Sequence, residues 1–249
     1  MNVLWRILGL HALAELGARL PAPLARLFNI SLVVVSNLVP LVGVLGGWMS
    51  FADVFVVYWL ETVVLGLFAV VRIATATRDR HLARRARVQT AMVFLLHYGL
   101  IAAGLGFFVF WMVNAAVAMG EDSEGVPWLA EPPTLAWGSW IFAGLGIFLS
   151  HLYTLTVYWF GREERRLYTP WQCMWPPYPR ILVLYPFYAL NVVVLIVLIL
   201  FAPVLLVVLL VACKLGLDLT LFALDRYLAR RRLRAASARE AAAVAGPVA

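Results

Sequence analysis

The chain has 249 residues, 64% of them hydrophobic, and its mean hydropathy is +0.90. Soluble domains are about 45–50% apolar, so this composition excludes an ordinary soluble protein and indicates a polytopic membrane protein. The net charge of +7 does not indicate a nucleic-acid partner, because the arginines gather at the ends of apolar runs, where membrane topology explains them. The two cysteines, Cys173 and Cys213, form no CxxC pair and imply no disulfide framework.

Residues 1–26 form a predicted N-terminal segment of mixed character. Its leucines predict a short helix that ends at Pro21 and Pro23, because proline interrupts a helix interior. The apolar positions spread around this helix instead of forming one stripe. We therefore expect the segment to lie at the cytoplasmic interface of the membrane rather than to span it.

Residues 27–225 are predicted to form a transmembrane domain of six helices. Each predicted span is a charge-poor apolar run of about 20 residues, the length that crosses a bilayer. Pro40 falls inside the first span and is expected to kink it, and Pro203 offers a turn between the last two spans. The predicted spans are residues 27–47, 51–75, 89–113, 135–160, 181–200 and 204–225.

The distribution of charge orients these helices. Six arginines from Arg72 to Arg87 place the loop after the second span in the cytoplasm by the positive-inside rule. The loop after the third span carries four carboxylates and no basic residue between residues 121 and 131, so we expect it outside. The basic loop 161–180 and the basic tail 226–249 both fall inside only if the chain has six spans.

The predicted fold class is therefore all-α, a polytopic membrane helix bundle of six transmembrane helices with both termini cytoplasmic. We expect it in the inner (plasma) membrane of the cell. The expected partners are the lipid bilayer and, at the Arg-rich cytoplasmic loops, anionic lipid headgroups. We expect residues 226–249, the Ala-rich basic tail, to be disordered.

Several ionisable side chains fall at bilayer depth, where charge is costly and usually functional. At about 1.5 Å of rise per residue, all of them lie between the midplane and the cytoplasmic third. Lys214 is the only lysine of the chain and precedes Asp218 by four residues, so the two share a helix face and can neutralise each other. A structural ion pair and a functional site both remain open. The predicted polar cluster, and the candidate catalytic set, is Glu61, His97, His151, Lys214 and Asp218.

Three chemistries fit this cluster. The candidate metal ligands are Glu61, His97, His151 and Asp218, a set of nitrogen and oxygen donors suited to a divalent metal such as Zn or Fe. No HExxH motif supports it, and two histidines at similar depth could instead hold a haem. A set of carboxylate, histidine and lysine could also relay protons or bind a transported substrate. An intramembrane serine protease is excluded, because the last span has no histidine to act as base.

Several short motifs occur in a fixed order along the chain. They are Asn37-Leu38-Val39-Pro40-Leu41-Val42-Gly43-Val44, Tyr58-Trp59-Leu60-Glu61, His97-Tyr98-Gly99, Ser150-His151, Pro177-Tyr178-Pro179-Arg180-Ile181 and Lys214-Leu215-Gly216-Leu217-Asp218-Leu219. In this ordered set the chain resembles an uncharacterised bacterial and archaeal membrane family, domain of unknown function 6498, over about residues 30–225. The resemblance implies a multi-span bundle and brings no activity, substrate or cofactor.

The chain departs from the family pattern at three places. The family tends to have histidines where this sequence has Leu105, Tyr185 and Phe222. A histidine-rich metal site would lose several ligands here, so the resemblance implies weakened or altered metal binding in a divergent member.

The sequence leaves three functions open for the polar cluster. The first is a membrane-embedded metal-dependent enzyme with Glu61, His97 and His151 as ligands. The second is a proton-linked transporter of a small solute, in which Glu61 titrates. The third is a non-catalytic membrane scaffold in which Lys214 and Asp218 form a purely structural pair.

Overall fold

The computed structural model describes residues 10–78, 84–121, 137–181 and 203–245, and their regular structure is entirely helical. Its elements are α2 (Leu10–Arg19), α3 (Ala22–Leu45), α4 (Phe51–Thr75), α5 (Arg84–Glu121), α6 (Trp137–Tyr153), η1 (Thr154–Gly161), η2 (Glu164–Arg166), α7 (Pro170–Met174) and α9 (Pro203–Ala245). Within these ranges, five helices are long and apolar enough to cross a membrane. Residues 182–200 of the predicted fifth span lie outside the described residues.

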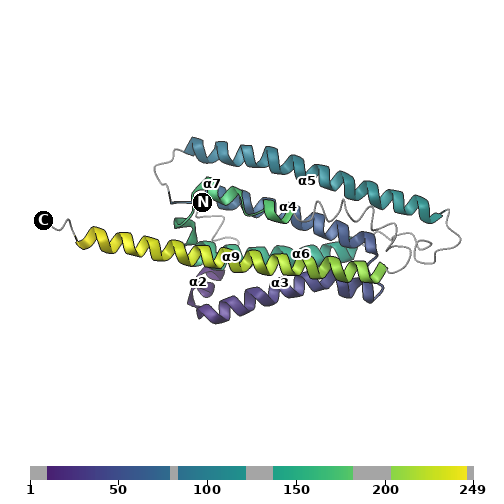
Figure 1. The fold of residues 1–249 in the computed structure, drawn as a ribbon, viewed down its shortest axis with the longest axis horizontal. Helices are drawn as coiled ribbons and strands as arrows, with labels where there is room; N and C mark the ends of the chain where they lie inside the picture. Colours follow the sequence, from purple (N-terminus) through teal and green to yellow (C-terminus); the bar gives the residue numbers. More distant parts are fainter. Residues whose placement is uncertain (1–9, 79–83, 122–136, 182–202, 246–249) are drawn as a thin grey trace.

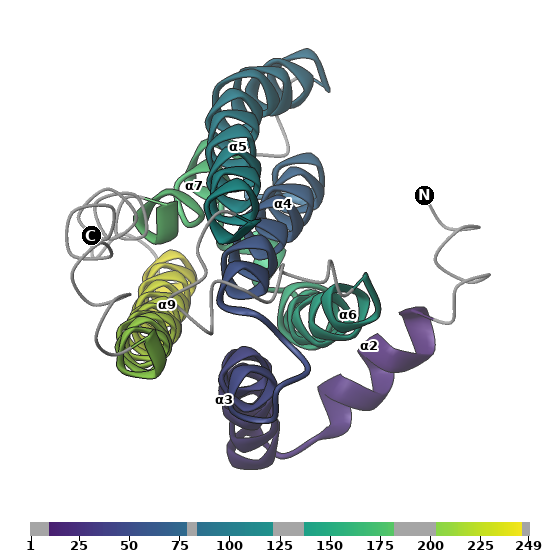
Figure 2. The same cartoon turned by 90° about the vertical axis from the view of Figure 1, so that its right-hand side faces the viewer.

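The five long helices lie side by side along the long axis of the molecule (Figure 1). Helices α3 and α5 run antiparallel to α4, α6 and α9. Seen from the end, α4 lies near the centre of the bundle, between α5 and α6 (Figure 2). In its most apolar stretch 61% of α4 is buried inside the protein, against 39% or less for the other four helices. The helix that carries Glu61 is therefore the central one.

The start of α4 is fixed by a capping box. The Ser50 hydroxyl accepts a hydrogen bond from the Asp53 backbone nitrogen at 3.2 Å, and the Asp53 carboxylate accepts one from the Ser50 backbone nitrogen at 2.6 Å. The other oxygen of the Asp53 carboxylate accepts a hydrogen bond from Trp140 Nε1 at 2.6 Å. These contacts set the register between α4 and α6, so the depth of Glu61 follows from a defined helix start.

Several predicted boundaries differ from the structure because hydropathy marks the apolar part of a helix and not its end. Helix α5 extends beyond the predicted span 89–113 at both ends. The prediction of a disordered tail is wrong as far as Ala245, because α9 continues from Pro203 through the basic segment without interruption. Between Leu217 and Ala245 the sequence has no glycine or proline and is rich in alanine, leucine and arginine, which are strong helix formers.

The segment after α6 was predicted as a loop, and the structure shows that part of it is helical and buried. Helix α7 begins with a capping box between Thr169 and Gln172 and packs against α4 and α5. Cys173, Met174 and Ile181 are buried in a core cluster of these helices. The proline-containing stretch therefore turns back into the bundle, and it carries Arg180 to the interior.

Short glycine contacts place α2 across the bundle axis, against η1 (Figure 2). The Cα of Gly17 lies so close to Val157 that an added Cβ would come within 2.4 Å of that side chain. A Cβ on Gly161 would lie 2.5 Å from the backbone oxygen of Ala14. Only glycine allows this approach, which attaches the N-terminal helix to the π-helical turn at the end of α6.

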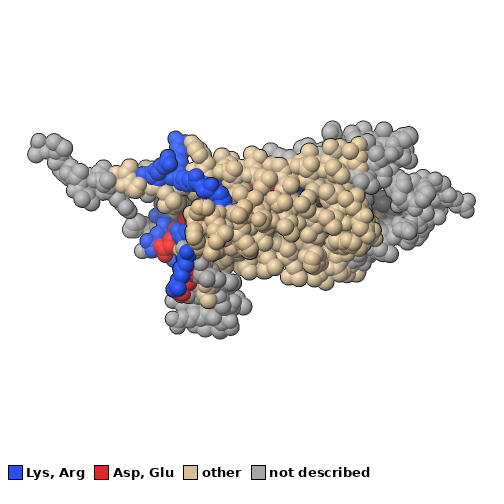
Figure 3. Space-filling view, turned by 90° about the horizontal axis from the view of Figure 1, so that it is seen from below, with Lys and Arg blue, Asp and Glu red and all other residues tan. Residues whose placement is uncertain are grey.

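Charge gathers at one end of the molecule. Figure 3 shows Lys and Arg side chains gathered at the end where α9 finishes, while other residues cover nearly all of the long flank on the face that it draws. This end is called the Arg-rich end below. The described interior contains three apolar clusters: one around Val54, Leu105 and Leu210, one nearer the Arg-rich end around Phe68 and Phe94, and a small one around Val157. A polar layer lies between the first two.

Candidate functional site

The polar layer is centred on Lys214, whose side chain is 4% exposed. Its Nζ lies 2.7 Å from Glu61 Oε2 on α4 and 2.7 Å from Asp218 Oδ2 one turn further along α9. The same atom donates to Asn37 Oδ1 on α3 at 2.6 Å. An ammonium group has three donors, so these three contacts satisfy it completely. The Tyr58 ring centroid, 4.9 Å from Nζ, adds a cation–π contact.

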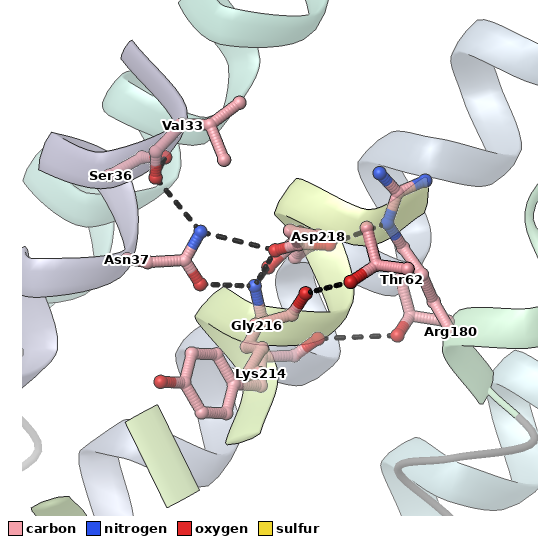
Figure 4. Close-up of polar contacts among 11 residues, drawn as sticks. Val33, Ser36, Asn37, Thr62, Arg180, Lys214, Gly216 and Asp218 are labelled. Carbon is pink, nitrogen blue, oxygen red and sulfur yellow. Dashed lines mark hydrogen bonds and ion pairs between the residues drawn. The ribbon is translucent and has the colours of Figure 1, made fainter. Parts of the chain in front are cut away.

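Asp218 is held on both of its oxygens. Oδ1 accepts a hydrogen bond from Arg180 Nε at 2.8 Å, and Oδ2 accepts one from Asn37 Nδ2 at 3.1 Å in addition to its contact with Lys214. Figure 4 shows that Asn37 and Arg180 reach the carboxylate from different segments of the chain. We call Asn37, Glu61, Arg180, Lys214 and Asp218 the ion-pair network.

The network carries two positive and two negative charges and is neutral as a whole. Neutrality matters at this depth, because an unpaired ion costs several kcal/mol in a low-dielectric interior. The i,i+4 spacing of Lys214 and Asp218 brings both onto one face of α9. Asn37 Nδ2 also donates to Val33 O at 2.9 Å, which directs the amide of Asn37 towards that face.

The structure brings together three of the five residues of the predicted cluster, Glu61, Lys214 and Asp218. His97 lies elsewhere: its side chain is exposed, and Nδ1 is 2.9 Å from the Tyr178 hydroxyl. His151 packs against the Phe68 ring at a centroid distance of 5.8 Å. Among the described residues, no hydrogen bond or ion pair joins it to Lys214. In the described part of the chain no three His, Cys, Asp or Glu side chains gather as a metal site requires. The structure therefore does not bring the four candidate ligands together at one point.

Sequence reasoning missed two members of the network, Asn37 and Arg180. Asn37 is an amide within an apolar run that carries no charge, which is a detectable signal for a buried polar contact. Arg180 had no such signal, because it follows four prolines in a stretch that resembles a surface loop. Only the return of this stretch into the bundle places its guanidinium beside Asp218.

A cavity of about 420 Å³ adjoins the network on the side of the Arg-rich end. Arg180, Asp218, Arg72 and Arg232 all line it. Arg232 follows Asp218 by 14 residues on α9 and therefore lies about 21 Å nearer the end where that helix finishes. Ser150, next to His151 on α6, lies along its side. Small-molecule sites are typically about 300–1,000 Å³ in volume, mostly apolar, with a few converging polar groups, and this cavity has those properties.

A second, much smaller space of about 10 Å³ lies behind Arg180 and Asp218. It is lined by Tyr58, Glu61 and Lys214, among others, and is close to the minimum volume that holds one water molecule. Arg180 and Asp218 line both spaces. They therefore separate the large cavity from Glu61 and Lys214.

A second group of ion pairs lies two helical turns along α9 from Asp218. Arg226 binds the Glu164 carboxylate through both Nη atoms, at 2.6 and 3.1 Å, and also contacts Asp225 at 2.7 Å. Burial raises the pKa of the Glu164 carboxyl above its ordinary value, and the Arg226 guanidinium opposes that shift. Tyr168 donates to Asp225 Oδ1 at 3.2 Å. These contacts attach the segment after α6 to α9.

By the length and composition of its helices, the fold is that of an integral membrane protein with a buried, fully paired polar site. The sequence model of the group described as "Family of unknown function (DUF6498)" matches residues 19–241, which is most of the chain. The protein belongs to this family, as its ordered motifs predicted. Neither a curated protein nor a solved structure matches the chain.

Proposed function

We propose that this protein is a multi-pass inner-membrane transporter that binds a small solute in the cavity and couples its movement to a proton at the ion-pair network. In this proposal the Arg-rich end faces the cytoplasm, as the positive-inside rule requires. Both termini then lie on the cytoplasmic side, and the outer loop is the acidic one at residues 121–131.

The cavity is the observation that carries the proposal. It extends from Arg72 and Arg232 to Arg180 and Asp218, and Asp218 lies 15 residues into α9, about 22 Å along that helix. Transporters bind their substrates near the bilayer midplane, and carboxylates at that depth commonly relay protons. A scaffold has no need of a ligand-sized cavity that ends at paired charges.

Glu61 is the member of the network best suited to exchange a proton. Among the described residues its ion pair is with Lys214 alone, whereas Asp218 binds both Lys214 and Arg180. Protonation of Glu61 would remove one of the two ion pairs of Lys214 and leave the other in place. The network can therefore change its charge by one without losing the contacts that hold α3, α9 and Arg180 together.

The metal-dependent enzyme receives no comparable support, because Glu61, His97 and His151 do not converge. Intramembrane histidines would have to surround one point to bind an ion. His97 is instead engaged with Tyr178, and His151 faces Phe68. The transporter and the scaffold remain, and they differ in whether Glu61 is needed for activity or for packing alone.

Proteoliposomes with a pH-sensitive dye in the lumen test the proposal. A panel of amino acids, dicarboxylates and short-chain carboxylates is added outside, and we expect at least one of them to change the lumenal pH. Glu61→Gln should abolish this change, and Glu163→Gln is the matched control, because Glu163 pairs with Arg165 and Arg166 away from the cavity. A proton signal that survives Glu61→Gln in folded protein would contradict the proposal, as would the absence of any signal from the wild type.

A further inference from the structure

The charges around the cavity do not balance. Among the described residues, five cations and four carboxylates line the cavities or pair with a lining residue. They are Arg72, Arg180, Lys214, Arg226 and Arg232 against Glu61, Glu164, Asp218 and Asp225. Lys214 and Arg180 are neutralised within the ion-pair network, and Arg226 has two carboxylates. The surplus positive charge therefore lies with Arg72 and Arg232.

These two arginines are also the ones without carboxylate partners. Within the described ranges no ion pair is formed by Arg72 or Arg232, and Arg72 Nε and Arg232 Nη1 are buried without a hydrogen-bond partner. Each guanidinium stacks on an aromatic ring instead, Arg72 at 5.6 Å from the Trp159 centroid and Arg232 at 4.2 Å from that of Tyr168. Stacking occupies the face of a guanidinium and leaves its N–H edge available for a bidentate acceptor.

The two guanidiniums line the same cavity and both lie close enough to Cys173 to influence its thiol. Both lower the pKa of the Cys173 thiol, although burial outweighs them and raises that pKa to about 12. A buried N–H group that lacks a partner is costly, and an anion between two such groups would remove that cost. Beyond the arginines the walls include apolar side chains, among them Leu65 and Leu221.

We propose that the cavity binds an organic monoanion, a carboxylate with an apolar body, with its anionic group between Arg72 and Arg232. The single surplus charge sets the charge of the ligand, and Leu65 and Leu221 contact its apolar body. This inference rests on the proposed function, because it takes the same cavity as the binding site, and it names the class of solute. The carboxylate is held at the entrance, away from the paired Asp218.

Phenylacetate is a suitable probe, and phenylacetamide is its neutral counterpart of nearly the same shape. Binding is measured by titration calorimetry on the full-length protein in nanodiscs of phosphatidylcholine alone. We expect phenylacetate to bind and phenylacetamide to bind at least about tenfold more weakly, as the loss of a hydrogen-bonded charge implies. Arg72→Gln and Arg232→Gln should each raise the Kd for phenylacetate at least about tenfold.

Two exposed arginines provide matched controls. Arg78→Gln lies beyond the end of α4, and Arg234→Gln lies on α9 two residues from Arg232. Neither control should change the Kd for phenylacetate. Equal effects of all four substitutions would overturn the proposal, because they would show general attraction to a basic surface. Equal binding of acid and amide would overturn it as well.

A lipid headgroup is the other source of an anion, and nanodiscs containing phosphatidylglycerol distinguish the two. If phenylacetate fails to bind in phosphatidylcholine while phosphatidylglycerol stabilises the protein through Arg72 and Arg232, the proposal of a free carboxylate is overturned. This binding assay does not depend on transport. Binding that depends on Arg72 and Arg232 without proton movement would support this inference and contradict the proposed function. Transport that depends on Glu61 without such binding would support the proposed function and contradict this inference.

Discussion

Replacing Lys214 by methionine removes the central cation of the ion-pair network while keeping an unbranched side chain one atom shorter. The substitution leaves Glu61 without its ion-pair partner, because Lys214 is the cation that the structure places within 4.0 Å of Glu61. Asp218 is affected less, since it keeps the Arg180 contact at 2.8 Å and the Asn37 contact at 3.1 Å. The two carboxylates should therefore respond differently to the same loss.

The expected magnitude follows from the burial of the pair. Glu61 and Lys214 side chains are 9% and 4% exposed, so removing one partner leaves a charge in a low-dielectric interior. Breaking a buried pair in this way costs about 3–5 kcal/mol. For a chain of this size about 1 kcal/mol shifts the midpoint of thermal unfolding by about 2–4 °C, so Lys214→Met should lower Tm by about 10 °C.

Thermal unfolding in detergent, followed by tryptophan fluorescence, measures this loss. A second substitution then identifies which carboxylate is left buried without an ion-pair partner. Glu61→Gln added to Lys214→Met should restore most of the lost Tm, because an amide at this position carries no charge to bury. Asp218→Asn added to Lys214→Met should restore less, since it removes a carboxylate that is still paired and strands Arg180 instead.

Two outcomes would refute this reasoning. If Lys214→Met lowers Tm by less than about 2 °C, the contacts of Lys214 do not carry the stability that burial assigns to them. If Asp218→Asn rescues the variant as well as Glu61→Gln does, the asymmetry between the two carboxylates is absent, and Glu61 is not the carboxylate that depends on Lys214.

Two further predictions concern the packing around the site. Gly66→Ala should destabilise the protein by about 1–3 kcal/mol, because its Cβ would lie 2.6 Å from the buried Tyr98 ring. Gly99→Ala has open space around its Cβ and should be neutral or stabilising by up to about 1 kcal/mol. Thermal unfolding compares the two variants, and equal losses of stability would contradict the packing. Burial raises the pKa of Cys173 to about 12, so in a Cys213→Ser background iodoacetamide should modify Cys173 slowly at pH 8 and faster as pH rises towards 12, because only the thiolate reacts. Mass spectrometry follows this reaction, and modification at pH 8 as fast as in unfolded protein would refute the burial of Cys173.

The sequence was informative about the helices wherever hydropathy and capping agree. The predicted second span, 51–75, coincides with α4, and the structure shows a capping box of Ser50 and Asp53 at the start that hydropathy had given. The ends of α5 and α9 were not predictable from hydropathy, since both helices continue into charged residues that favour a helix without favouring lipid. The six-span topology and the orientation remain predictions.

The sequence predicted the depth of the polar side chains but not the direction in which each one points. Depth follows from counting residues along a span, and it placed Glu61, Lys214 and Asp218 at the level where they meet. Direction depends on how each helix is rotated about its axis, and that is set by packing. On α5 the interior position belongs to Tyr98, which donates to Thr62 O at 2.8 Å, so the neighbouring His97 points away.

Long-range contacts explain what the sequence could not supply for the site. Arg180 reaches Asp218 across 38 residues, and Asn37 reaches it across 181. No local spacing indicates either contact. By comparison, Lys214 and Asp218 are four residues apart, and their pairing follows from the geometry of one helix. Residues brought in by a returning segment can be recognised only when the fold of that segment is known.

Accessibility of Ser150 tests the central claim, a cavity that connects the Arg-rich end with the ion-pair network. In a background with both native cysteines replaced by serine, Ser150→Cys should react with a membrane-impermeant thiosulfonate applied from the Arg-rich side of oriented vesicles. Ile147→Cys is the control, because Ile147 lies almost one turn away on α6, is 4% exposed and is absent from the cavity wall. Reaction of Ser150→Cys from the opposite side, or no faster than Ile147→Cys, would contradict the account.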